Sequence, residues 1–427
     1  MASSTRQRWS RRELVALAIG LLGAGLLRLA LLPTVGLRDD TDQFAGWVHR
    51  LATDLPLGQA YRMDLTFGPV MVYLFQLMGL LQPAFQAATD ASDPAVRAVI
   101  KLPAGIADLG IAVVVAWLLR DRPRPAIAAA LAVAFVPVTW FVSAWWGQFE
   151  AIYALFGLLA VAAALSGHPI WAGIALGLAV SIKPQALPFL VPFAAWILAS
   201  GGWRVAGRSA LAGLATVAIL WVPFLADGGP GAYLRNIGAY QDGVFAVMSL
   251  RAWNPWWILQ SSAAGDAFLP DTVALLGPLT PRMIGYGLAA VLELGVFLLV
   301  FRARTPRGLL LGAAATVLVA YLALTTMHER YSWAALVFLA PLLADRRVAV
   351  AWVVLAAATF ANYLAAIPIV AGGAPLLPID GPLGIAGSVA ITGVGLAVVW
   401  LLAEEARGGG SRAASRRPND NRGDPGR

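Results

Sequence analysis

The sequence contains no cysteine, which excludes disulfide bonds and thiolate metal sites. Charged residues are also scarce: they make up 13% of the 427 residues, whereas soluble globular domains carry roughly 25%. Lysine is almost absent, because Lys101 and Lys183 are the only lysines among 31 basic residues. Apolar residues reach 59% and form long runs. This composition excludes a soluble globular protein and predicts an all-α polytopic membrane protein.

The formal net charge of +8 does not predict a nucleic-acid partner. The charges lie in short loops between apolar runs and do not gather on one face. Since about 20 apolar residues cross a bilayer, these runs are candidate membrane spans. The first is too long for a signal peptide, so we expect an uncleaved helix. The candidate spans are 14–35, 97–119, 124–144, 149–166, 169–182, 187–199, 206–226, 283–301, 307–326, 331–344, 347–370 and 384–402.

One further apolar run, 67–86, decides the topology. If it crossed the membrane, the arginines of 120–124 would lie outside and every later basic loop would be inverted. If it does not cross, the basic loops lie on the cytoplasmic side, as the positive-inside rule requires. Those loops contain Arg120, Arg122, Arg124, Arg204, Arg208, Arg302, Arg304, Arg307, Arg346 and Arg347. We therefore predict that 67–86 is a re-entrant or surface-lying segment.

The predicted architecture is about 12 transmembrane helices with both termini in the cytoplasm. Residues 1–405 form the transmembrane domain. Its long first external loop, 36–96, carries interfacial helices, and 227–282 is the second large external loop. The tail 406–427 is predicted to be disordered, basic and cytoplasmic, which suits the anionic inner leaflet. Abundant Arg, Ala and Gly are typical of a GC-rich bacterial gene, so the predicted location is a bacterial plasma (inner) membrane.

Under this topology, five polar clusters share the outer face, and each lies at the boundary of a span. Together they predict the wall of an outward-facing cavity. Its carboxylates could act as a general base or hold a metal ion. Its cations suit a phosphate, and its tryptophans could pack against a sugar ring or a prenyl chain. The clusters are Asp39–Asp40–Asp42, Trp145–Glu150, Lys183–Pro184–Gln185, Ala252–Trp257 and His328–Tyr331.

Each cluster also has a simpler interpretation. The acids could be solvated or cap a helix, and Lys183 could snorkel. The tryptophans, including that of Trp146-Gly147-Gln148, could be ordinary interface anchors, and His328–Glu329–Arg330 could be a local ion pair. The coincidence of all five clusters on one face is what favours a site. Two acids inside spans, Asp108 and Glu293, are more simply structural, and Arg28 is a candidate partner.

These motifs together resemble the GT-C glycosyltransferases, over roughly residues 36 to 335. Family members use polyprenyl- or dolichyl-phosphate sugars on the external or lumenal face. The likeness is closest to bacterial proteins similar to GPI mannosyltransferases and to dolichyl-phosphate-glucose glucosyltransferases. Two departures are Thr66–Pro69 where a Tyr-Pro-Pro segment is usual, and Glu150 where Asp is common. The motifs are Asp40-Thr41-Asp42 with Trp47, Gly58 and Tyr61; Lys101-Leu102-Pro103 with Asp108; Trp146-Gly147-Gln148; Lys183-Pro184-Gln185; Ala252-Trp253-Asn254 with Trp257; and His328-Glu329-Arg330-Tyr331.

The resemblance implies a GT-C fold and an inverting transfer of a hexose, with mannose favoured, from a polyprenyl-phosphate donor to an acceptor hydroxyl of a glycan, lipid or protein. Asp40 would be the general base, because it stands seven residues before Trp47, and Asp42 would assist it. The donor phosphate would be held by His328, Glu329, Arg330 and Lys183. No cofactor is required, although a divalent metal is compatible. The expected substrate-binding residues are Gln148, Glu150, Gln185, Trp253, Asn254 and Trp257.

Two other functions fit the same sequence. A transporter or flippase for lipid-linked sugars would have internal repeats and helices interrupted at the midplane, and we find no repeat. A non-catalytic membrane subunit would leave the acid cluster free to vary.

Overall fold

The computed structural model describes residues 9–265, 267–370 and 372–414, which form helices joined by loops and isolated bridges, with no strand. Many helices begin with proline, whose fixed φ and missing N–H suit a first turn. Others begin at a side-chain cap, such as the capping box of Ser10 and Glu13 or the cap by Asp93. The predicted all-α class is therefore confirmed for the described residues.

The first half of the chain contains α1 (Arg11–Leu31), α2 (Arg38–Thr53), α3 (Pro69–Leu81), α4 (Pro94–Leu118), α5 (Pro123–Phe135), α6 (Pro137–Trp140), α7 (Glu150–Leu165) and α8 (Pro169–Val180). Its short 3-10 or π turns are η1 (Leu57–Arg62), η2 (Pro83–Gln86) and η3 (Phe141–Trp146).

The second half contains α9 (Leu190–Trp221), α10 (Gly229–Ala239), α11 (Pro255–Ala264), α12 (Pro281–Ala303), α13 (Pro306–Ala323), α14 (Ala334–Leu339), α15 (Arg346–Ala366) and α16 (Gly381–Ala414). Its short turns are η4 (Pro184–Phe189), η5 (Val222–Phe224), η6 (Tyr240–Val244) and η7 (Ala340–Leu342).

Among the described residues, seven helices are long and apolar enough to cross a membrane, or eight if the pair 123–135 and 137–146, bent by 47°, forms one span. The protein is therefore a multi-pass membrane protein. One of the seven stretches, 184–224, has 41 residues and breaks at Gly202. Three predicted spans fall on α7, α8 and α14, which have 16, 12 and 6 residues. The count of 12 crossings stays a prediction.

The break at Gly202 divides α9 into two helical arms. Ser209, early in the second arm, donates a hydrogen bond to Pro169 O at the start of α8 (2.7 Å). Late in the same arm, Leu220 O accepts a hydrogen bond from Tyr73 on α3 (2.8 Å). The second arm therefore runs alongside α8 and ends beside the segment 36–96, which contains α2 and α3.

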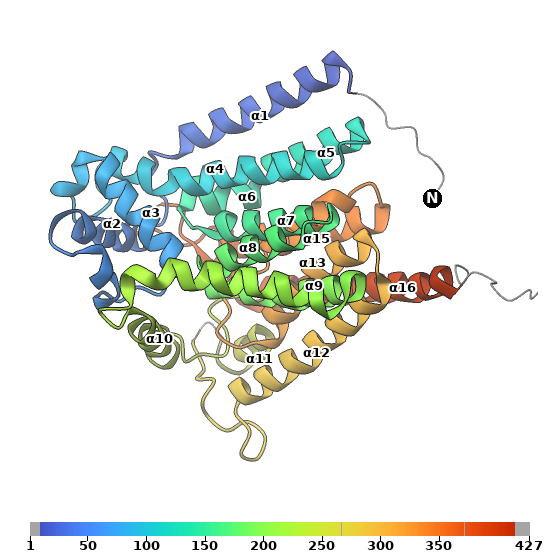
Figure 1. The fold of residues 1–427 in the computed structure, drawn as a ribbon. Coiled ribbons are helices and arrows are strands. Elements are labelled where there is room, and N and C mark those ends of the chain that lie inside the picture. Colours follow the sequence, from blue (N-terminus) through green and yellow to red (C-terminus); the bar gives the residue numbers. More distant parts are fainter. Residues whose placement is uncertain (1–8, 266, 371, 415–427) are drawn as a thin grey trace, which may run out of the picture.

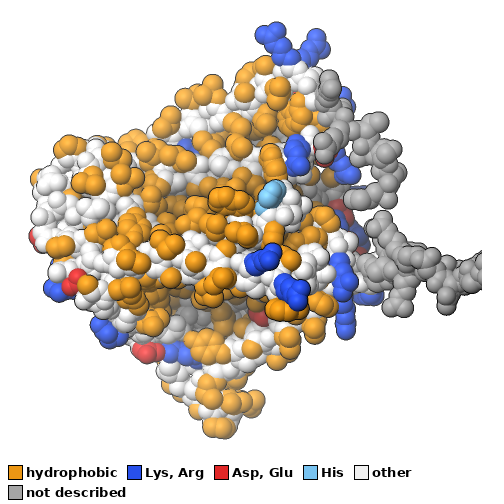
Figure 2. All heavy atoms as spheres, viewed as in Figure 1, with side chains coloured by type: hydrophobic (Ala, Val, Ile, Leu, Met, Phe, Trp, Pro, Cys, Tyr) orange, Lys and Arg blue, Asp and Glu red, His pale blue; other side chains and the backbone are white. Residues whose placement is uncertain are grey.

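The basic loops and the segment 36–96 lie at opposite ends of the molecule. Figure 1 shows the start of α1 and the end of α16 at one end, and α2, α3 and α10 at the other. Trp9 Nε1 donates to Arg120 O (2.7 Å), which joins the start of α1 to the loop between α4 and α5. Arg307 pairs with Asp345 (2.7 Å) and with Glu405 (3.4 Å), which joins the start of α13 to the start of α15 and to α16. Figure 2 shows mostly apolar side chains between the ends, as lipid contact requires.

The amphipathic helix α2 packs its apolar face on α3. The rings of four residues form a cluster with centroid distances of 5.7 to 6.3 Å: Phe44, Trp47, Phe67 and Phe75. Phe149 joins this cluster at 4.9 Å from Phe44. α3 has 13 residues, about 20 Å at 1.5 Å per residue, which is shorter than the hydrocarbon core. That length agrees with the prediction that 67–86 does not cross.

The last described helix, α16, enters the tail that follows Glu405. α16 continues to Ala414, well inside the predicted disordered segment 406–427. Upstream of this tail, α16 pairs with two arginines: Glu405 pairs with Arg307 (3.4 Å) and Glu404 pairs with Arg347 (2.7 Å). The predicted disorder of 406–427 stays a prediction, and 415–427 lies outside the described residues.

Candidate functional site

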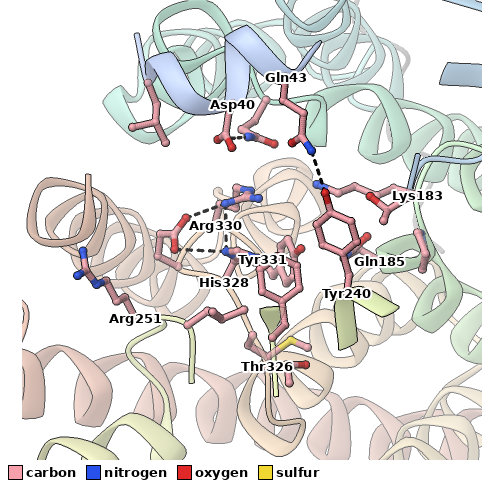
Figure 3. A pocket seen from close by; sticks show the side chains of 18 of the residues that line it. Asp40, Gln43, Lys183, Gln185, Tyr240, Arg251, Thr326, His328, Arg330 and Tyr331 are labelled. Carbon is pink, nitrogen blue, oxygen red and sulfur yellow. Dashed lines mark hydrogen bonds and ion pairs between the residues drawn. The ribbon is translucent and has the colours of Figure 1, made fainter. Parts of the chain in front are cut away.

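A cavity of about 470 Å³ lies at the end of the molecule that carries α2 and η6. This volume is in the range of small-molecule sites, roughly 300–1,000 Å³. Figure 3 shows Asp40 and Gln43 on α2 facing a wall that contains His328, Arg330 and Tyr331. The polar lining residues are Asp40, Gln43, Thr66, Gln148, Lys183, Gln185, Tyr240, Gln241, Arg251, Thr326, His328, Glu329, Arg330 and Tyr331.

Asp40 is held through one carboxylate oxygen. Trp146 Nε1 (2.8 Å) and Gln148 Nε2 (2.6 Å) both donate to its Oδ2. No hydrogen bond from a described residue reaches Oδ1. The turn between the two donors passes through Gly147 at φ 99°, where a β-carbon would lie 3.3 Å from Thr41 Cγ2. Glycine is thus required where α2 meets the 146–148 turn.

Lys101 supports this turn from beneath. Its buried ammonium donates to Trp145 O (2.6 Å) and to Thr34 O (2.7 Å), and so ties α4 to η3 and to the chain after α1. Further along α4, Asp108 pairs with Arg28 (2.9 Å). The expectation that Asp108 is a structural acid with Arg28 as partner is confirmed.

Lys183 is brought to the cavity by a backbone pairing between two distant loops. Gly68 N donates to Ile182 O (2.9 Å), and a β-carbon on Gly68 would lie 2.3 Å from Ser181 O, so only glycine fits. The Lys183 ammonium then lies 5.5 Å from the ring of Phe67. It donates to Glu150 Oε1 at 2.7 Å. Lys183 therefore does not snorkel to solvent, since it is buried and paired.

Arg330 joins the same buried network. Its Nε donates to Glu150 Oε1 (3.1 Å), and its NH1 donates to Glu329 Oε1 (2.9 Å). A second contact from NH1 reaches His328 Nδ1 at 3.3 Å. Because arginine can only donate, Nδ1 accepts and the imidazole carries its proton on Nε2. The network thus contains two cations, two carboxylates and a neutral imidazole.

The protonation states fit this arrangement. Burial lowers the pKa of His328 below its usual range, and the positive charge of Arg330 lowers it further. Burial opposes ionisation of Glu329, but the charge of Arg330, which donates to Glu329 Oε1, favours it and the pKa of Glu329 lies below its usual range. Burial also lowers the pKa of Lys183, against the opposing charge of Glu150. The predicted phosphate ligands Lys183 and Arg330 therefore already have carboxylate partners.

Several predicted site residues lie outside the cavity lining. Asp42 accepts a hydrogen bond from Ala91 N (2.9 Å) and pairs with Arg38 (3.1 Å), so it anchors α2 to the segment before α4. Glu150 is fully buried one layer behind the lining, where it neutralises Lys183 and Arg330. The structure thus brings Asp40 to the cavity without Asp42.

The Trp-Asn motif of the segment 227–282 is packed into the protein. Trp253 Nε1 donates to Ile379 O (3.0 Å). Asn254 caps α11 and donates to Tyr321 O (3.0 Å), and Trp257 is fully buried. The structure places Trp253, Asn254 and Trp257 outside the cavity lining, and their role in substrate binding stays a prediction. Gln148 and Gln185 do line the cavity.

Other lining residues were missed at the sequence level. Gln43 follows Asp40 by three residues on a helix, a spacing that could have identified it. Its Nε2 donates to Tyr240 Oη on η6 (2.8 Å), which joins α2 to the segment 227–282. Asp64 accepts from Trp47 Nε1 (2.8 Å) behind this contact. Arg251 precedes the buried Trp-Asn motif, and no sequence pattern distinguishes it.

Among the described residues, no three His, Asp or Glu side chains form a group that could hold a metal ion. Asp40 lines the cavity with one oxygen that accepts no hydrogen bond from a described residue. Comparison of the chain with models of known protein families and with curated proteins gives no match.

Proposed function

We propose that the protein is an inverting glycosyltransferase of the GT-C type, which moves a hexose, mannose first among the candidates, from a polyprenyl-phosphate-linked donor to an acceptor hydroxyl of a glycan, lipid or protein. The observation that supports this most is the state of Asp40. Its Oδ2 is fixed by Trp146 and Gln148, while no described residue hydrogen-bonds to Oδ1 in the cavity. A carboxylate oriented in this way suits a general base.

The proposed reaction is a single displacement. Asp40 takes the proton from the acceptor hydroxyl as its oxygen bonds to the anomeric carbon. The bond from that carbon to the phosphate oxygen breaks, and the lipid phosphate leaves with the electron pair. Gln185, whose Oε1 is buried without a hydrogen bond from a described residue, offers an acceptor for a sugar hydroxyl.

The orientation follows from charge. The cavity lies at the end of the molecule opposite the basic loops. By the positive-inside rule, those loops and both termini would be cytoplasmic, and the cavity would face outward from a bacterial plasma membrane. The apolar lining residues Phe44, Phe67 and Phe245 would border the donor.

The test compares two neighbouring acids. Purified protein is incubated with radiolabelled polyprenyl-phosphate mannose and a membrane extract as acceptor. Asp40→Asn keeps an oxygen for Trp146 and Gln148 but loses the base, so we expect transfer to fall about 100- to 10,000-fold. Asp39→Asn is the matched control, since Asp39 is exposed and does not line the cavity. It should transfer at the wild-type rate.

Wild-type transfer by Asp40→Asn would exclude Asp40 as the base. If the wild-type protein transfers no sugar but moves the labelled lipid across reconstituted vesicles, the protein is a transporter and the proposed function is wrong.

A further inference from the structure

The cations of the cavity differ in whether a carboxylate neutralises them. Lys183 pairs with Glu150 at 2.7 Å, and Arg330 pairs with both Glu150 (3.1 Å) and Glu329 (2.9 Å). Arg251 also lines the cavity, yet no carboxylate of the described residues lies within ion-pair distance of its guanidinium. Among the described residues, Arg251 is therefore a lining cation without an ion-pair partner.

The Arg251 side chain keeps hydrogen-bonding capacity as well as charge. Its NH1 donates to Ala366 O at the end of α15 (3.3 Å), and its guanidinium carbon lies 5.9 Å from the ring of Phe268. Its Nε is buried and donates to no described acceptor. A buried donor without a partner is unfavourable by about 1–3 kcal/mol in a protein interior. NH1 thus has an acceptor, whereas Nε has none among the described residues.

The backbone of Arg251 is held in an uncommon conformation. Its φ is +60°, in the left-handed region that residues other than glycine seldom adopt. Leu250 N donates to Met327 O (3.0 Å), and Asn362 Nδ2 donates to Arg251 O (2.8 Å), so contacts on both sides fix this conformation. Thr326, across this pairing, is at φ +61° and also lines the cavity. Such outliers gather at functional sites.

We propose that Arg251 binds the anionic group of the ligand, a phosphate ester, in place of the motif cations Lys183 and Arg330. This inference rests on the proposed function, which supplies the phosphate. A guanidinium is planar and always charged, and it pairs with phosphate through two parallel donors. Figure 3 shows Arg251 on the other side of His328 and Arg330 from Lys183. The phosphate would therefore lie toward the end of α15, and Lys183 and Arg330 would hold the cavity floor.

The experiment measures binding of farnesyl phosphate and of farnesol to detergent-purified protein. The two probes share a prenyl chain and differ in the phosphate. We expect the wild-type protein to prefer the phosphate, and Arg251→Gln to bind it about 10- to 100-fold more weakly without a change for farnesol. Arg235→Gln is the matched control, since Arg235 is exposed on α10 outside the cavity. It should behave as wild type.

An unchanged preference for the phosphate in Arg251→Gln overturns the assignment of Arg251. Equal weakening for farnesol and for the phosphate also overturns it, because the effect would then be one of shape. If sugar transfer fails in the earlier assay while the phosphate preference still depends on Arg251, the anion site stands and the glycosyltransferase proposal falls.

Discussion

The buried network beneath the cavity allows a sharp prediction for Glu150→Gln. Glu150 is fully buried, and its Oε1 accepts hydrogen bonds from both Lys183 and Arg330. The substitution keeps the shape and removes the negative charge. Arg330 keeps Glu329 as a partner at 2.9 Å, whereas Lys183 keeps no carboxylate within ion-pair distance. The unpaired charge is therefore that of Lys183.

The magnitude follows from the burial of that ammonium. Lys183 is 6% exposed, and Phe67 and Tyr331 offer it only ring faces at 5.5 and 5.3 Å. Removing one partner of a buried ion pair lowers the free energy of unfolding by about 3–5 kcal/mol. Lys183→Met leaves Glu150 paired with Arg330, so its effect should be milder. We expect it to lower the free energy of unfolding by about 1–3 kcal/mol, the range for a lost charge-assisted hydrogen bond.

The double variant decides whether charge is the cause. Glu150→Gln combined with Lys183→Met leaves the introduced amide oxygen accepting from Arg330 and removes the stranded ammonium. We expect it to be more stable than Glu150→Gln alone. The free energy of unfolding is measured by tryptophan fluorescence in mixed micelles of a mild and a denaturing detergent. A double variant as unstable as the sum of the two single variants would refute the reasoning.

Two further predictions test the pKa values and the role of Trp253. Because the folded pKa of His328 is lowered, its contribution to stability is present above its unfolded pKa of about 6.5 and is lost as pH falls, by up to about 1.4 kcal/mol per pH unit. Glu329, with a pKa of about 2, stays ionised between pH 7.5 and 5.5. His328→Gln should therefore flatten the dependence of unfolding free energy on pH in that window, and an unchanged slope contradicts the assignment. Trp253→Phe leaves Ile379 O without its donor and should lower the unfolding free energy by about 1–3 kcal/mol, with farnesyl phosphate affinity unchanged. Weaker binding at full stability would instead support a substrate-binding Trp253.

Much of the fold was predictable because hydropathy and charge act locally. Apolar runs locate the helices, and the arginine-rich loops identify one end of the molecule. At that end Arg307 pairs with Asp345 and with Glu405. The break at Gly202 falls between two predicted spans for the same reason. Helix lengths were less accessible. The predicted span 331–344 contains α14, which has only 6 residues. The apolar run does not reveal that the chain on either side of α14 leaves the α-helical conformation.

The candidate site was predictable only in part, because pairing between distant side chains is not encoded by local spacing. The spacing to Trp47 selects Asp40, and the structure places Asp40 in the cavity. The same reasoning could not show that Asp42 turns toward Ala91, or that Glu150 neutralises both motif cations. Glu150 lies 33 residues from Lys183 and 180 residues from Arg330 along the chain.

The division between paired and unpaired groups sets what a ligand must bring. Asp40 has a fixed oxygen and an available one, and Arg251 has a satisfied nitrogen and an unsatisfied one. Lys183 and Arg330 are already matched by carboxylates, so an anion added beside them would need to displace Glu150 or Glu329 from a buried pair. A ligand that presents a proton donor to Asp40 and an anion to Arg251 leaves those pairs intact. An acceptor hydroxyl together with a phosphate-linked donor meets both demands at once, whereas a neutral sugar alone would leave Arg251 uncompensated.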